Sequence, residues 1–238
     1  MPATPLEVEN LSAGYGPTRV LEGVSFSVPA GARLAVLGRN GMGKTTLLAT
    51  LAGQTKRYDG RIRLGSTDVT AMPSAARAHQ GLGFVPQARC VFPTLTVEEN
   101  LFVGLKGRPK TALEEAYQMF PRLKERRRNL GNQLSGGEQQ MLSTARSILG
   151  RPSVLLLDEP LEGLAPVICE ELMAAFAVLA KTGDMTIVLV EQRIQSALDF
   201  ADQVVVLERG RLAWAGTPAN LTKDHEAVES LLGVGGLH

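Results

Sequence analysis

The sequence has few of the residues that hold small secreted proteins together, and no long apolar run of the kind that crosses membranes. Among 238 residues it has only two cysteines, Cys90 and Cys169, too few and too far apart for a disulfide framework or a cysteine metal cluster. The longest apolar run, Leu172 to Ala180, is far shorter than the roughly 20 residues that span a bilayer. The first residues show no basic start followed by an apolar stretch, so we expect no secretory signal and a cytoplasmic location.

The chain also lacks an excess of either charge. Lysine and arginine number 25 and aspartate and glutamate 24, so the net charge is +1 and no global field attracts nucleic acid or anionic lipid. The one basic cluster, Lys124 to Arg128, is more typical of a solvated helix face than of a nucleic-acid site. We therefore predict no nucleic-acid partner, and partners must be inferred from local chemistry.

The spacing of apolar residues changes several times along the chain. Short alternating segments separated by Gly and Pro turns predict a small antiparallel sheet near the N-terminus, at residues 6–10, 24–28 and 61–64. Apolar strands that alternate with helical patterns predict a mainly parallel sheet. The expected strands are 33–37, 154–157, 185–190 and 204–207, and the expected helices are 44–52, 167–180 and 194–200.

Two further segments complete this pattern. From 111 to 128 apolar residues recur every three or four positions, which predicts an amphipathic helical insert despite Pro121. Residues 208–211 read as a turn that joins the last apolar strand to 212–215, followed by a short helical tail.

The loop between the strand at 33–37 and the helix at 44–52 reads GRNGMGKT and fits the phosphate-loop pattern G-x-x-x-x-G-K-[ST]. Glycines let backbone N–H groups converge on phosphate oxygens, and the helix start adds its positive dipole. Lys44 would neutralise the outer phosphates, and the Thr45 hydroxyl would ligate Mg²⁺. The predicted nucleotide contacts are Gly38, Arg39, Asn40, Gly41, Met42, Gly43, Lys44, Thr45 and Thr46.

A second group of polar residues follows the aliphatic run at 154–157, in the sequence VLLLDEP. Ligand sites lie at the carboxyl ends of parallel strands, so Asp158 would lie beside the phosphate loop and hold Mg²⁺ through water. Glu159, one step further, would polarise the attacking water as the catalytic base. Capping of the next helix is an equal alternative for an isolated Asp-Glu pair, and the phosphate loop favours the catalytic interpretation.

A second Gly-rich segment, LSGGEQQ at 134–140, opens another predicted helix. Its residues Ser135, Gly136 and Gly137 could donate hydrogen bonds to phosphate, and the alternative is a simple helix cap by Ser135. GRNGMGKT, FVPQ, LSGGEQ and VLLLDEP occur in this order, and over essentially its whole length the chain resembles the ATP-binding cassette ATPases. The resemblance implies an α/β fold: a P-loop NTPase core with a mainly parallel sheet, an N-terminal antiparallel β subdomain and an inserted α-helical subdomain. It implies a single domain, 1–238, whose core comprises 6–88 and 152–238 and whose helical insert, 89–151, carries LSGGEQ.

The resemblance also assigns roles that the residues alone would not. Tyr15 would stack on adenine, although a turn tyrosine is the alternative, and Gln87 would touch Mg²⁺ and the attacking water. The cofactors would be ATP and Mg²⁺. Most of the family has a histidine that contacts the γ-phosphate after the strand at 185–190, where this chain has Gln192. Glutamine can donate a hydrogen bond to phosphate but cannot carry charge, so Gln192 would act as a weaker catalytic group.

One branch of the family is indicated by GRNGMGKTTLL, VFPTLTVEENL, EGLAP and LVEQ, which resemble the ATP-binding subunit of branched-chain amino acid importers. Urea and amide importers are close alternatives. The resemblance implies a head-to-tail pair with a second ABC ATPase subunit, the same or different, in which the LSGG loop of one covers ATP held by the other. It also implies transmembrane permeases, an extracytoplasmic substrate-binding protein that acts indirectly, and a place on the inner face of the membrane. A phosphate-loop kinase or GTPase would have no reason to carry LSGGEQ. A non-transport ATPase of the same class stays an alternative.

Overall fold

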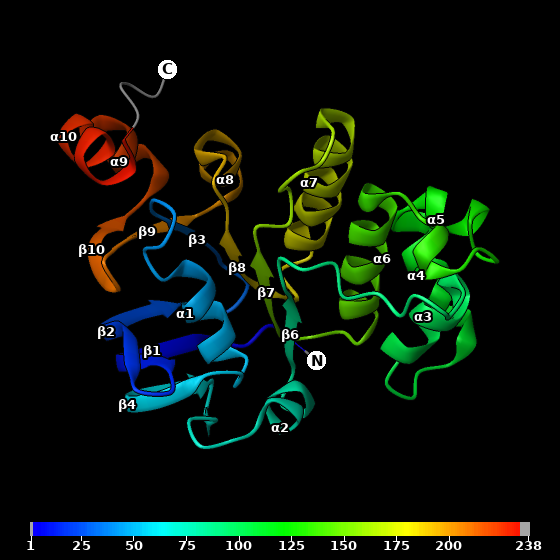
Figure 1. Ribbon diagram of the computed structural model, residues 1–238, viewed down its shortest axis with the longest axis horizontal. Coiled ribbons are helices and arrows are strands. Elements are labelled where there is room, and N and C mark those ends of the chain that lie inside the picture. The colour runs from blue at the N-terminus through cyan, green and yellow to red at the C-terminus, as the bar shows by residue number, and fades with distance from the viewer. Residues whose placement is uncertain (1, 234–238) are drawn as a thin grey trace.

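Two β-sheets form the centre of the computed structural model, which describes residues 2–233 (Figure 1). The smaller sheet has the order β2-β1-β4-β5, and the larger has the order β10-β9-β3-β8-β7-β6. The strands are β1 Leu6–Tyr15, β2 Thr18–Val28, β3 Arg33–Leu37, β4 Lys56–Leu64, β5 Thr67–Asp68, β6 Leu82–Val85, β7 Val154–Asp158, β8 Thr186–Val190, β9 Gln203–Glu208 and β10 Arg211–Gly216. The α-helices are α1 Lys44–Leu51, α2 Ser74–His79, α3 Val97–Gly104, α4 Leu113–Met119, α5 Pro121–Glu125, α6 Gly136–Leu149, α7 Pro166–Lys181, α8 Ile194–Phe200, α9 Pro218–Lys223 and α10 His225–Ala227. Short 3-10 turns lie at Lys110–Ala112 and Gly131–Gln133, and a π-helical turn lies at Val228–Leu232.

The smaller sheet is the antiparallel sheet that the N-terminal pattern predicts. β1 pairs antiparallel with both β2 and β4, so it is the central strand of the three. Its strands extend beyond the predicted segments. The register of β1 shifts between Val8 and Leu11 and again before Ala13, and such bulges break the alternation of inward and outward side chains. The periodicity therefore ended at residue 10, whereas the strand continues to Tyr15.

The larger sheet confirms the predicted mainly parallel core. β9, β3, β8, β7 and β6 run parallel, and β10 pairs antiparallel with β9 at one edge. β7 and β8 are buried along their whole length, as continuous aliphatic strands of a covered parallel sheet should be. Three residues of α1, Leu47, Leu48 and Leu51, belong to a hydrophobic core shared by both sheets. This packing anchors α1, the helix that follows the phosphate loop.

The predicted helical region at 111–128 is helical in the structure as far as Glu125, in separate pieces. The segment 111–128 is not one helix: a 3-10 turn leads into α4, which ends before Phe120 (φ −132°, ψ 84°), and α5 begins at Pro121. Proline lacks the N–H that a continued helix would need and disfavours helical backbone in the residue before it, so Pro121 instead takes the first position of a new helix.

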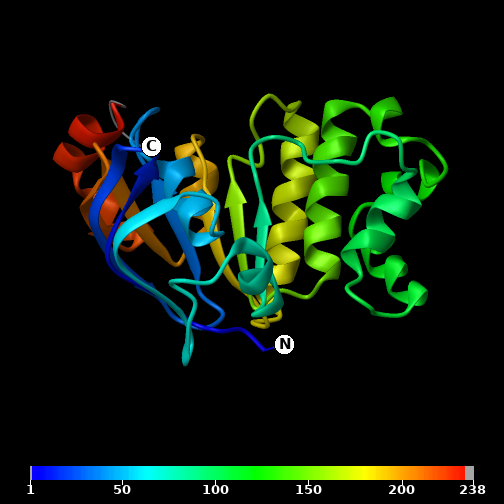
Figure 2. The ribbon, with the colours of Figure 1, turned by 60° about the horizontal axis from the view of Figure 1, so that its bottom comes forward.

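Helices α3 to α6 pack around one another, and α6 also packs against β6 of the larger sheet. α6 contacts α3, α4 and α5, and its buried residues belong to the same hydrophobic core as β7, β8 and α7. Figure 2 shows α6 beside α7, with the smaller helices further from the sheet. The division into a core (6–88 and 152–238) and an insert (89–151) stays a prediction. Within residues 2–233, no helix combines the length and apolar character needed to cross a membrane.

Candidate functional site

The phosphate loop lies between the end of β3 and the start of α1. Gly38 has a φ of +142°, and a Cβ at this position would collide with the carbonyl oxygen of Leu207 in β9. Gly43 precedes α1 with a φ of +99° and makes no side-chain cap, so the first N–H groups of α1 have no side-chain acceptor from this residue. Glycine is required at both positions because other residues rarely adopt these angles. The result is a helix start with free donors, the geometry that binds anions.

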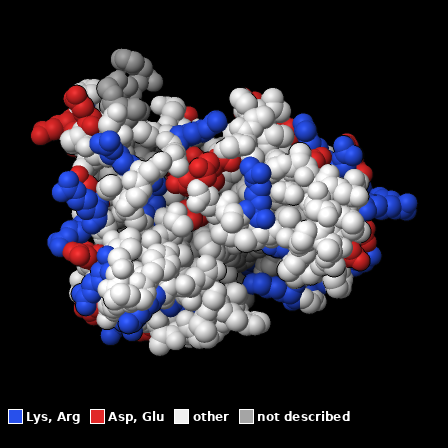
Figure 3. All heavy atoms as spheres, in the orientation of Figure 1, with Lys and Arg blue, Asp and Glu red and all other residues white. Residues whose placement is uncertain are grey.

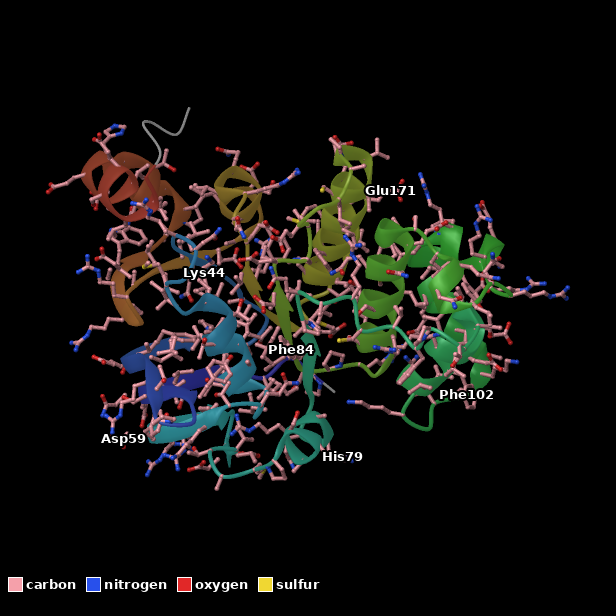
Figure 4. All side chains as sticks on the ribbon, viewed as in Figure 1. Lys44, Asp59, His79, Phe84, Phe102 and Glu171 are labelled. Atoms are coloured by element: carbon pink, nitrogen blue, oxygen red, sulfur yellow. The ribbon has the colours of Figure 1, made fainter. Side chains whose placement is uncertain are left out.

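Lys44, the first residue of α1, is buried and turns back over its own loop. Its Nζ donates to the carbonyl oxygens of Gly38 at 2.8 Å and Arg39 at 3.2 Å. Burial lowers the pKa of Lys44, and the negative charge of Glu159 acts in the opposite direction. The Lys44 side chain is therefore held against the phosphate loop, with its ammonium group close to Glu159 (Figure 4).

Asp158, the last residue of β7, faces the start of α1. The Thr45 hydroxyl donates to Asp158 Oδ1 at 3.2 Å, while Oδ2 is buried and has no hydrogen-bond partner among the described residues. Burial raises the pKa of Asp158 to about 6, and the hydrogen bond from Thr45 acts against this rise. A buried carboxylate oxygen without a donor is suited to a cation or a bound water.

Glu159 follows directly and has an unusual backbone. Its φ of +46° lies in the left-handed region, and its N–H donates to the carbonyl oxygen of Val190 at 2.9 Å. Such backbone strain in a residue other than glycine is concentrated at functional sites. The carboxylate accepts from Gln192 Nε2 at 2.5 Å and Gln87 Nε2 at 3.3 Å, and Oε1 lies 3.8 Å from Lys44 Nζ.

Lys44, Thr45 and Glu159 line one cavity of about 300 Å³ above the phosphate loop. Figure 3 shows acidic atoms gathered on this face where β7 and β8 end. The lining residues are Val20, Asn40, Gly41, Gly43, Lys44, Thr45, Thr46, Gln87, Glu159, Glu162 and Gln192. The structure thus brings together most of the residues that the sequence predicts for phosphate, metal and catalysis.

Tyr15 and the second glycine loop, residues 134–137, do not line this cavity. Tyr15 ends β1 and is 52% exposed. Ser135 caps α6: its Oγ accepts from Glu138 N at 3.3 Å, and Glu138 Oε2 accepts from Ser135 N at 2.8 Å. The helix cap that the sequence left as an alternative is therefore present, on a loop away from the phosphate loop.

Sequence reasoning missed two acidic residues near this cavity. Glu162 lines it and accepts a short hydrogen bond from Gln87 Nε2. Glu191, which follows β8, is only 2% exposed. A polar residue at the end of a buried strand is an ordinary pattern, so the local sequence gave Glu191 no role. Its burial arises from packing between strands that are distant in the chain.

Comparison with known proteins agrees with this geometry. A family model described as ABC transporter matches residues 21–162. The high-affinity branched-chain amino acid transport ATP-binding protein BraG of Pseudomonas aeruginosa is 38% identical over 96% of this chain and 99% of its own length. The probable branched-chain amino acid transport ATP-binding protein LivF of Archaeoglobus fulgidus is 36% identical over 95% and 97%. A solved ATP-binding subunit of an ABC transporter matches with a TM-score of 0.82 at 26% identity, over 96% of each chain.

The parallel sheet and the phosphate loop define the class as a P-loop NTPase. With the comparisons, the chain belongs to the ABC transporter family, as the ATP-binding subunit. It is thus an ATPase whose nucleotide hydrolysis powers transport, as the order of its motifs predicts.

Proposed function

We propose that this chain hydrolyses Mg²⁺-ATP to drive an importer of branched-chain amino acids. The observation that carries the hydrolytic part is the convergence of Lys44 and Glu159 on one cavity at the phosphate loop, with Asp158 bonded to Thr45 of the same cavity. The cargo is supported by the similarity to BraG and LivF, whose names describe branched-chain amino acid transport. Urea or amide import is the alternative cargo within the same assignment.

ATP would bind with its phosphates along residues 38–46 and its adenine against Tyr15. Lys44 neutralises the outer phosphates, which its buried position beside the loop carbonyls supports. Glu159 polarises the attacking water, and Gln192 would contact the γ-phosphate. In the structure Gln192 donates to Glu159, so the same side chain would have to turn toward the phosphate when ATP binds.

The side chains fit Mg²⁺, a cation that takes oxygen ligands. Thr45 and Asp158 would hold it, because their oxygens lie together and Asp158 Oδ2 is buried without a partner among residues 2–233. Gln87 lines the same cavity and would add its side-chain oxygen. When bound, the ion would supply positive charge that offsets the charge of the phosphates and the charge that develops during hydrolysis.

The second glycine loop would complete the ATP site of another subunit. Ser135, Gly136 and Gly137 are at least partly exposed and lie outside this chain's own phosphate cavity. A head-to-tail pair with a second ABC ATPase, identical or different, would use both loops. Permeases in the membrane would then place the pair on its cytoplasmic face, and an extracytoplasmic binding protein would deliver the cargo. Residues 89–151 would act as the helical unit that carries this loop.

The test is affinity purification of a tagged Glu159→Gln protein from detergent-treated native membranes with ATP and Mg²⁺. Glutamine cannot act as the base, so the ATP-bound pair should persist and carry its partners. Lys44→Ala is the matched control, because loss of phosphate binding should prevent the pair from closing. Recovery of a second ABC ATPase with two permeases supports the proposal, and their binding protein identifies the cargo. Recovery of soluble proteins or nucleic acid alone, equally with both variants, would contradict it.

A further inference from the structure

Glu191 is a buried carboxylate that the proposed chemistry does not use. It follows β8 and is only 2% exposed, whereas its neighbours Gln192 and Arg193 are exposed. Burying a carboxylate is costly unless hydrogen bonds compensate for the lost water. The carboxylate of Glu191, buried directly before Gln192, must therefore be stabilised by hydrogen bonds.

The hydrogen bonds of Glu191 hold the turn that follows β8. Its Oε1 accepts from the backbone N–H of Gln192 at 2.9 Å and of Arg193 at 3.2 Å. The backbone N–H of Leu161 also lies near the carboxylate and lowers the pKa of Glu191, against the effect of burial. Gln192 belongs to the turn after β8, whereas Leu161 belongs to the turn after β7. One buried side chain thus holds the turn after β8 and lies near the turn after β7.

These same turns carry the groups that meet above the phosphate loop. Glu159 lies two residues before Leu161, and its carboxylate accepts from Gln192 Nε2 at 2.5 Å. Glu159 also has a left-handed backbone, a conformation that persists only where surrounding structure holds it in place. A second connection between the strand ends is the bond from Glu159 N to the carbonyl oxygen of Val190.

We propose that Glu191 is a positioning residue for ATP hydrolysis: its buried carboxylate holds the backbone of Gln192, whose side-chain amide contacts Glu159, so that Glu159 is directed at the attacking water. This inference rests on the proposed catalytic role of Glu159. Glu191 is not among the residues that line the cavity above the phosphate loop. Burial raises the pKa of Glu191, in keeping with a side chain that is shielded from solvent.

The experiment compares Glu191→Gln with Glu191→Leu in the full chain purified with its native partners. Glutamine keeps the accepting oxygen, and its amide replaces Oε2, which has no partner among the described residues. Leucine fills a similar volume but accepts no hydrogen bond. We expect Glu191→Leu to lower kcat roughly ten- to hundredfold, because small misplacements of catalytic groups have effects of this size. ATP affinity should change by about twofold at most, and Glu191→Gln should retain most of the wild-type kcat.

The double variant Glu191→Leu/Gln192→Ala separates positioning from general stability. If Glu191 acts through the turn that carries Gln192, the two losses in kcat should not add. Additive losses, or an unchanged kcat in Glu191→Leu with only a lower melting temperature, would overturn the inference. If Glu191→Leu does not fold, Glu191→Asp shortens the side chain and takes its place, with the same outcomes.

Glu159→Gln, measured in parallel, distinguishes the two proposals. Loss of turnover in Glu159→Gln with normal turnover in Glu191→Leu would reject only the role of Glu191. Normal turnover in Glu159→Gln would reject the catalytic assignment on which that role depends.

Discussion

Two Gly-rich loops in this chain each open a helix, and only one of them forms a binding cavity. The phosphate loop ends at Gly43, which gives α1 no side-chain cap, and Lys44, Asp158 and Glu159 surround the helix start. The second glycine loop begins α6 with a capping box from Ser135 and lies outside that cavity. A glycine-rich helix start is therefore suited to phosphate only where neighbouring elements add charged side chains and the other residues that line a cavity. For α6, a partner subunit would have to supply these residues.

The largest expected effect separates chemistry from binding at the phosphate loop. Glu159→Gln should lower kcat by about 10² to 10⁴, the usual contribution of a general base. ATP affinity should stay within a few-fold because Lys44 and the loop are unchanged. Steady-state hydrolysis and equilibrium nucleotide binding measure the two quantities. Wild-type turnover in this variant would mean that the cavity at the phosphate loop uses another base.

Alanine at corresponding glycines of the two loops should have opposite signatures. Gly43→Ala places a Cβ at a φ of +99°, 3.0 Å from Leu21 Cδ2, and should weaken ATP binding by about tenfold or more. Gly136→Ala would displace the flexible guanidinium of Arg89, so folding should change little. It should leave the chain's own ATP affinity intact while lowering kcat. Isothermal titration measures the ATP affinity of each variant, and hydrolysis assays measure its kcat. Weakened ATP binding in Gly136→Ala would contradict the different roles assigned to the two loops.

The sequence predicts the first loop well because its chemistry is local. GRNGMGKT predicts phosphate binding and a strand-loop-helix unit, and the structure contains that unit; the aliphatic run before Asp158 indicates a buried strand, which is β7. The left-handed backbone of Glu159 and the burial of Glu191 were not predictable in this way. Both depend on β7 lying beside β8, so that Asp158 is opposite Val190. Pairing between strands far apart in the chain leaves no local pattern. The break at Phe120 does have a local signal, Pro121, which apolar spacing alone does not capture.

A smaller effect tests Gln192, which lines the cavity of the phosphate loop and has no counterpart at the second glycine loop. Gln192→His should raise kcat at saturating ATP several-fold, because histidine can carry a positive charge toward the γ-phosphate and glutamine cannot. Gln195→His, on the exposed side of α8, is the control and should leave kcat unchanged. A lower kcat in Gln192→His would show that the amide itself is the better group here.

Burial of Asp158 should also make the free energy of unfolding depend on pH. Asp158 has a pKa of about 6 in the folded chain against an ordinary value of 3.8, so the folded state binds more protons between these values. The nucleotide-free protein should therefore lose stability as pH rises through this window, by up to about 1.4 kcal/mol per pH unit from this group. Asp158→Asn removes the titrating group but keeps an oxygen for Thr45. Denaturant unfolding at several pH values should show the difference between variant and wild type growing up to pH 6 and then levelling.

The smallest expected effect concerns the cap that only the second glycine loop possesses. Glu138→Ala removes the acceptor for Ser135 N–H and the neighbour of Arg126, and should cost about 0.5 to 1 kcal/mol of unfolding free energy. Glu138→Gln keeps an accepting oxygen and should recover most of that loss. ATP affinity should be unchanged in both, since the capped helix does not face the phosphate cavity. A change in affinity would mean that α6 and the phosphate loop are linked within one chain, so that the two helix starts would not be independent half-sites.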